Sequence, residues 1–208
     1  MIINNDSIFY KIDGNIFPAK DLLYIDAIRH TAQIIDISYS RLVLTLLSEE
    51  NNLQNELAIS DGLSIVGSLN RLRALLEKAP NISHNLPWYK NYYHKIKIVK
   101  DIRDFLEHFD EKIQSQIEND NFTLGYIGWA ELKDDKTIVT KILFSLRVKN
   151  SAVLKVINPT GKEFRWKLDH ITFYINDSAI NLSDMYYGLI EFINNYETYI
   201  KSKIINTI

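Results

Sequence analysis

The spacing of the apolar side chains changes partway along this chain, and the change limits the folds open to it. Up to about residue 118, apolar residues recur every three or four positions, which is the period of an amphipathic helix. From residue 122 they alternate with polar residues, which is the period of a half-buried strand. Helical spacing returns near Ser183. The sequence therefore predicts an α+β fold that is mainly helical, with a small antiparallel sheet before the last helix.

Start and stop signals divide the first part into three long helices. They are predicted over residues 18–48, 60–79 and 87–118, with proline at the start of the first and third and Ser60 as the N-cap of the second. A last helix is predicted over residues 183–205, with Ser183 as its N-cap. This helix and the helical region 17–118 are expected to form an antiparallel four-helix bundle.

The sheet is predicted within residues 121–176. Residues 133–136 read as the turn between two strands, and residues 153–157 read as a third strand. The apolar alternation then slips by one position near Asp169 and His170, which predicts a β-bulge there. Since neither a repeat nor a linker-like segment interrupts the pattern, the chain is expected to form a single domain over 1–208.

Composition excludes several classes of site and partner. The chain has no cysteine, so it has no disulfide-linked partner and no thiol chemistry. Its net charge of -2 provides no overall basic field for nucleic acid, so such a role needs a local basic patch. The N-terminus lacks the features of a signal peptide, and no apolar run is long enough to span a membrane. We expect a cytoplasmic protein that needs no metal and no cofactor.

The predicted helix 87–118 is polarised in charge. Residues 86–103 carry five basic side chains and one acidic, whereas residues 104–120 carry one basic and six acidic. This order opposes the helix dipole, which favours acids near the N-terminus and bases near the C-terminus. Two copies related by a two-fold axis near residues 103–108 would pair each basic half with an acidic half, which predicts a homodimer. The alternative is a solvated face whose charges pair within one chain.

Within this helix, residues 103–108 carry side chains suited to chemistry on a phosphate. His108 is a candidate general acid and base for attack of a ribose 2′-hydroxyl on RNA phosphate. Arg103 would stabilise charge on that phosphate, and Asp104, four positions before His108, would orient the imidazole. At a rotation of about 100° per residue, Arg103 and His108 point about 140° apart. They converge only across an interface between subunits, or if Arg103 reaches round.

Aromatic and basic residues alternate just before this segment. Tyr89, Lys90, Tyr93, Lys97 and Lys100 are candidates for binding RNA, because rings stack on unpaired bases and lysines contact phosphates. The alternative is that aromatic residues at helical spacing lie in the core.

Arg103, the polar residue Asp104 and His108 match the R-x4-6-H motif of HEPN domains, so the chain resembles an HEPN-like helical bundle. Many members of that family carry a tyrosine two positions after the histidine, where this chain has Asp110. Residues 61–76, with 103–111, also look like an uncharacterised group of bacterial proteins. The resemblance implies a bundle of four or five helices, a homodimer and an RNA cleft at the dimer interface. The β segment is not part of the usual HEPN core.

Two functions stay open at this point. The first is a metal-independent endoribonuclease that cleaves RNA at a homodimer cleft, with Arg103, Asp104 and His108 as catalytic residues. The second is a non-catalytic dimeric binding or scaffold protein, in which Arg103 pairs structurally with Glu107 or Asp110.

Overall fold

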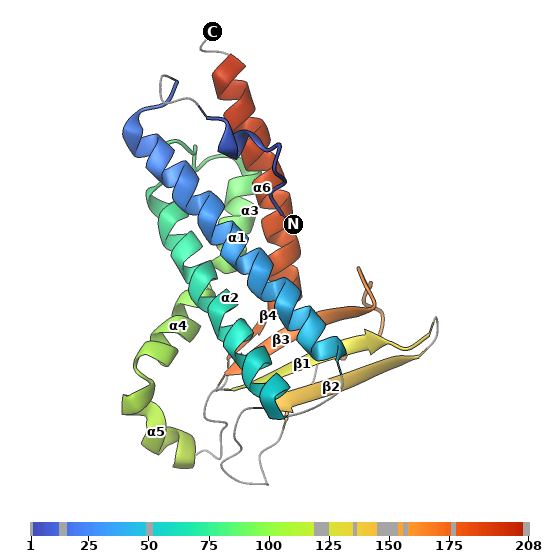
Figure 1. Cartoon of the computed structure of the whole chain (residues 1–208). Helices are drawn as coiled ribbons and strands as arrows, with labels where there is room; N and C mark the ends of the chain where they lie inside the picture. Colours follow the sequence, from blue (N-terminus) through green and yellow to red (C-terminus); the bar gives the residue numbers. More distant parts are fainter. Residues whose placement is uncertain are drawn as a thin grey trace.

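A computed structural model of the chain shows a mainly helical protein with one four-stranded antiparallel sheet, which confirms the predicted fold class (Figure 1). The structure describes residues 2–12, 16–48, 52–118, 125–134, 137–144, 154–155, 158–175 and 178–205. The helices are η1 (Ile8–Tyr10), α1 (Ala19–Leu47), α2 (Asn52–Lys78), α3 (Pro87–Ile96), α4 (Val99–Glu107), α5 (Phe109–Glu118) and α6 (Leu182–Ile205).

The first predicted helix is confirmed, since α1 begins directly after Pro18. The second begins earlier than predicted, at Asn52 rather than Ser60. Ala58 and Ile59 are almost fully buried, so the buried face of α2 extends back before Ser60. The apolar contacts of these two residues outweigh the capping preference of Ser60.

The prediction of one continuous third helix is wrong. The helix is interrupted by a turn at Lys97 and Ile98, and it ends again at His108, whose backbone (φ -106°, ψ 28°) leaves the helical region. Apolar residues are buried on both sides of the first break, and they face different partners. Helix α3 packs against α2 and α6, whereas α4 packs against α2. The breaks let each short helix bury its own apolar face.

Helices α1 and α3 lie on opposite sides of α2 and α6. Each of α1 and α3 packs against both α2 and α6, and Figure 1 shows α1 in front with α3 behind it. Helix α4 packs against α2, and α5 follows it at the lower left of that view. The regular four-helix bundle stays a prediction, because the third helix is divided into three pieces.

The strands are β1 (Tyr126–Leu132), β2 (Ile138–Phe144), β3 (Leu168–Ile175) and β4 (Ser178–Asn181), in the order β2-β1-β3-β4. The sheet therefore continues to residue 181, beyond the predicted end at 176. Of the predicted strand 153–157, only Leu154 and Lys155 are described, and they are not in a strand. Side chains from β1 and β3 join those of the helices in one hydrophobic core, among them Ile127 and Phe173.

The predicted β-bulge is confirmed. Gly128 pairs with Thr172 and Ala130 pairs with Asp169, so two steps along β1 match three along β3. His170 lies within this extra step, and its φ of 55° is the one positive φ of a non-glycine residue in the described part of the chain. The extra residue explains why Leu168 and Ile171, three positions apart, both reach the core.

The last helix begins one residue earlier than predicted, at Leu182, and its N-cap lies two residues before the predicted one. Asn181, not Ser183, caps α6, because its side-chain oxygen accepts a hydrogen bond from the backbone N–H of Asp184 at 2.9 Å. The Ser183 hydroxyl is buried and accepts hydrogen bonds from the backbone N–H of Ile171 and from the hydroxyl of Tyr39. Ser183 therefore joins the sheet to α1.

Candidate functional site

The predicted catalytic residues lie at the junction of α4 and α5. The Arg103 guanidinium contacts the carboxylates of Glu107 and Asp104, the latter at 3.3 Å. The Nδ1 atom of His108 lies 3.6 Å from a carboxylate oxygen of Glu111. No hydrogen bond between the side chains of Asp104 and His108 occurs in the described structure. Asp104 therefore pairs with Arg103 rather than orienting the imidazole.

Arg103 and His108 face different surroundings. Arg103 lines an open polar hollow of about 440 Å³ between α2 and α4, whereas His108 does not line it. The lining of this α4 hollow is mostly polar and consists of Ser64, Gly67, Ser68, Asn70, Arg71, Arg103 and Glu107. His108 follows the last residue of α4, and its side chain is 59% exposed. One subunit alone presents the two groups separately, as the helical rotation predicts.

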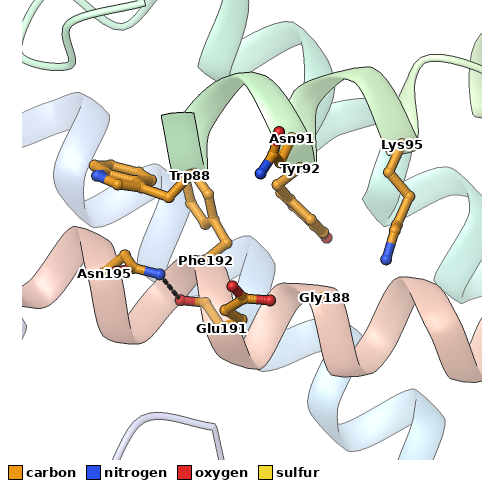
Figure 2. Close-up of a pocket in the computed structure, with 8 residues that line it drawn as sticks. All are labelled: Trp88, Asn91, Tyr92, Lys95, Gly188, Glu191, Phe192 and Asn195. Atoms are coloured by element: carbon orange, nitrogen blue, oxygen red, sulfur yellow. Dashed lines mark hydrogen bonds between the residues drawn. The ribbon is translucent and has the colours of Figure 1, made fainter. Parts of the chain in front are cut away.

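Most of the predicted RNA-binding residues lie together in a second open depression, the α3 groove, of about 390 Å³. Its lining combines rings, basic groups and one carboxylate, from Glu77, His84, Tyr89, Lys90, Tyr93, His94 and Lys97. The groove thus contains four of the five predicted residues, and Lys100 lies outside its lining. Lys90, His94 and Lys97 share one face because they follow the spacing i, i+4, i+7, whereas Lys95 points toward α6 (Figure 2).

Three rings in the α3 groove are stacked almost parallel to one another. The rings of His84 and Tyr89 are 4.8 Å apart with an interplanar angle of 7°, and those of Tyr89 and Tyr93 are 5.6 Å apart at 8°. The hydroxyl of Tyr89 donates a hydrogen bond to the carbonyl of Leu76 at 3.0 Å. Burial, together with nearby Tyr93 and Glu77, raises the pKa of Tyr89 to about 12. Tyr89 is therefore the fixed middle ring, and His84 and Tyr93 form the ends of the stack.

His84, His94 and Glu77 were not predicted as parts of this groove. The spacing of His94 with Lys90 and Lys97 would have placed it on the same face of α3. His84 comes from the loop before α3, and Glu77 comes from the last turns of α2. No local pattern connects these two residues to the lysines, because the tertiary fold brings them together.

The opposite side of α3 faces α6 and encloses a small pocket (Figure 2). Its volume is about 70 Å³, which is enough for water-sized species but not for a nucleobase. The Tyr92 ring and the Lys95 side chain point from α3 toward α6. A Cβ atom on Gly188 would lie 3.3 Å from both the Tyr92 ring and the Lys95 Nζ atom, so glycine permits the close approach of the two helices. We assign this pocket to helix packing.

The described residues contain no group of three or more His, Asp or Glu side chains that could hold a metal ion. Within the same residues, no helix has the length and apolar character needed to cross a bilayer. No protein-family model, no curated protein and no solved structure matches the chain. The resemblance to HEPN domains therefore depends on the residues themselves, above all Arg103 and His108.

Proposed function

We propose that this chain binds single-stranded RNA in the α3 groove. The observation that supports the proposal is the ordered stack of His84, Tyr89 and Tyr93 beside two lysines. Proteins that bind single strands combine aromatic rings, on which bases stack, with basic groups that contact the phosphates. The groove has both kinds of group within one depression.

Each group in the groove has a separate part in this proposal. Tyr93 is half-buried at one end of the ring stack, so an unpaired base can extend the stack there. Lys90 and Lys97 are exposed, so their ammonium groups can reach the phosphates on either side of that base. The Glu77 carboxylate can accept a hydrogen bond from an exocyclic amino group of the base.

We expect Tyr93→Ala to weaken binding of a labelled single-stranded RNA by about 5- to 100-fold, since stacking of one base contributes about 1–3 kcal/mol. Lys97→Ala should reduce the affinity for RNA. It should also lower the slope of log Kd against log salt concentration by the contribution of about one phosphate contact. Fluorescence anisotropy at several salt concentrations measures both effects.

The matched controls for this experiment are Trp166→Ala and Lys20→Ala, which remove an exposed ring and an exposed lysine outside the groove. Both should leave the affinity unchanged. If the wild-type protein fails to bind the RNA, or if the control variants lose as much affinity as the groove variants, RNA binding in the α3 groove is refuted.

A second candidate function is metal-independent cleavage of RNA by an HEPN-like homodimer. It is favoured by the side chains of Arg103 and His108, which are 39% and 59% exposed and so accessible to a phosphate. In the proposed reaction, His108 takes the proton of the 2′-hydroxyl as its oxygen attacks phosphorus, and a proton is returned to the departing 5′-oxygen. Arg103 of the other subunit stabilises the charge on the phosphate. The pairing of Arg103 with Glu107 favours the alternative, a non-catalytic binding protein.

For a nuclease, His108→Ala should reduce cleavage of labelled RNA in the presence of EDTA by about 100-fold or more. Lys162→Ala, which removes an exposed basic side chain outside both the α3 groove and the α4 hollow, is the control and should leave the rate unchanged. A mixture of Arg103→Ala and His108→Ala proteins should recover about a quarter of the wild-type rate, since half of the dimers would contain one intact site. Cleavage that is the same in His108→Ala as in wild type eliminates the nuclease but not RNA binding.

A further inference from the structure

The outward face of α1 carries exposed aliphatic side chains at heptad spacing. Leu23, Ile37 and Leu44 are 72%, 57% and 65% exposed, and His30 lies midway between Leu23 and Ile37, seven residues from each. Residues seven apart lie on one side of a helix, so these four form a continuous stripe of about 30 Å along α1. The high exposure of the three aliphatic residues shows that the rest of the described fold leaves them open to solvent.

The stripe meets an apolar groove at one end. Leu44 lines this aromatic groove, of about 310 Å³, and the 52% exposed Trp166 lines it as well. The other lining residues are Tyr39, Ser40, Val43, Tyr186 and Tyr187. An exposed apolar stripe that continues into an apolar groove is typical of a protein–protein contact surface. The opposite end of the stripe carries Leu23, the most exposed of its three aliphatic members.

The charges beside the stripe indicate which partner fits it. Asp26 and Arg41 flank the aliphatic residues, and their side chains are 67% and 62% exposed. Each also forms an ion pair within its own chain, Asp26 with Arg29 and Arg41 with the buried Asp61. They lie at equal distances along the sequence from the midpoint between Gln33 and Ile34, as do Leu23 and Leu44. An antiparallel copy of α1 therefore sets Asp26 opposite Arg41, whereas a parallel copy sets each charge opposite its equal. An antiparallel pair about a two-fold axis therefore avoids contacts between like charges at these positions.

We propose that two copies of this chain pair through antiparallel α1 helices, about a two-fold axis between Gln33 and Ile34. Leu23 of each copy then packs against Leu44 of the other and enters its aromatic groove. This surface differs from the one on the third helix, through which the charge pattern of the sequence predicts that two copies pair. The α1 pairing does not depend on RNA binding, since no residue of the α3 groove takes part in it.

The absence of native cysteines allows a direct test by disulfide cross-linking. A Leu23→Cys/Leu44→Cys variant should form a covalent dimer on mild oxidation, detected on a non-reducing gel. Neither single variant should do so, because the two copies of residue 23 lie about 30 Å apart in an antiparallel pair and a disulfide needs Cα atoms within about 7 Å. Leu57→Cys, at a 49% exposed leucine of α2, is the control for random collision.

Each outcome of this experiment decides the proposal. Cross-linking of Leu23→Cys alone would indicate a parallel pair and overturn the antiparallel one. Failure of the double variant to cross-link, with a monomeric mass for the wild type by light scattering at micromolar concentration, would overturn the interface itself. Leu23→Asp should raise the dimer Kd by about tenfold or more without changing the far-ultraviolet circular dichroism spectrum, whereas Leu57→Asp should leave the Kd unchanged.

Discussion

Replacing Phe173 by alanine is expected to lower the free energy of unfolding by about 3–5 kcal/mol. Phe173 is fully buried in the middle of β3, between Ile127 of β1 and Ile180 of β4. Its ring also approaches α2, since a Cβ atom added to Gly62 would lie 3.5 Å from it. The substitution therefore leaves a cavity where the sheet meets the helices. Urea denaturation followed by circular dichroism and by tryptophan fluorescence measures the loss.

The control for Phe173→Ala is Phe144→Ala in the edge strand β2, where the native side chain is 38% exposed. This change should cost about 1 kcal/mol, because less apolar surface is lost from the interior. Equal losses at the two positions, or a loss below about 1.5 kcal/mol at Phe173, would contradict the packing of the sheet against α2.

The second large effect is expected at the β-bulge. The fully buried Asp169 carboxylate accepts hydrogen bonds from the backbone N–H groups of Arg165 at 2.8 Å and His170 at 2.6 Å. Asp169→Ala leaves both donors without this acceptor, and each unsatisfied donor costs about 1–3 kcal/mol. We therefore expect a loss of about 2–5 kcal/mol in urea denaturation. Asp169→Asn should lose less, since the amide oxygen still accepts from one of the two donors.

Arg165 provides the control for this prediction, because it is held by two carboxylates. Its guanidinium lies 2.6 Å from Asp184 and 3.8 Å from Asp169. Asp184→Ala removes an exposed ion pair, which contributes about 0–1 kcal/mol, and leaves the backbone bonds to Asp169 intact. If Asp184→Ala costs as much as Asp169→Ala, the ion pair with Arg165, and not the backbone hydrogen bonds, stabilises the bulge.

Sequence patterns predicted features of this fold that are determined over a few neighbouring residues. The bulge at His170 was visible because one extra residue shifts the alternation of Leu168 and Ile171. The breaks in the third helix were not visible, because the apolar spacing continues through Lys97 and His108. The breaks arise from tertiary packing, since α3 packs against both α2 and α6 whereas α4 packs against α2.

The same distinction applies to the candidate sites. Lys90, Tyr93 and Lys97 share a face of α3 because of their spacing, and the structure places them in one groove. The prediction that Asp104 orients His108 was based on their helical i, i+4 spacing. The backbone N–H of His108 does donate to the Asp104 carbonyl, but the Asp104 carboxylate pairs with its neighbour Arg103, and the His108 imidazole lies near Glu111 instead.

The positions of α1 and α3 on opposite sides of α2 and α6 have a consequence for stoichiometry. In a dimer paired through α1, the two α3 grooves would face away from each other. A short oligonucleotide would then occupy one groove only, so each dimer would bind two strands independently. A long strand that passes around the dimer would contact both grooves and gain avidity from the high effective concentration of its second segment. The helix arrangement would thus make the dimer bind long RNA strands more tightly than short ones.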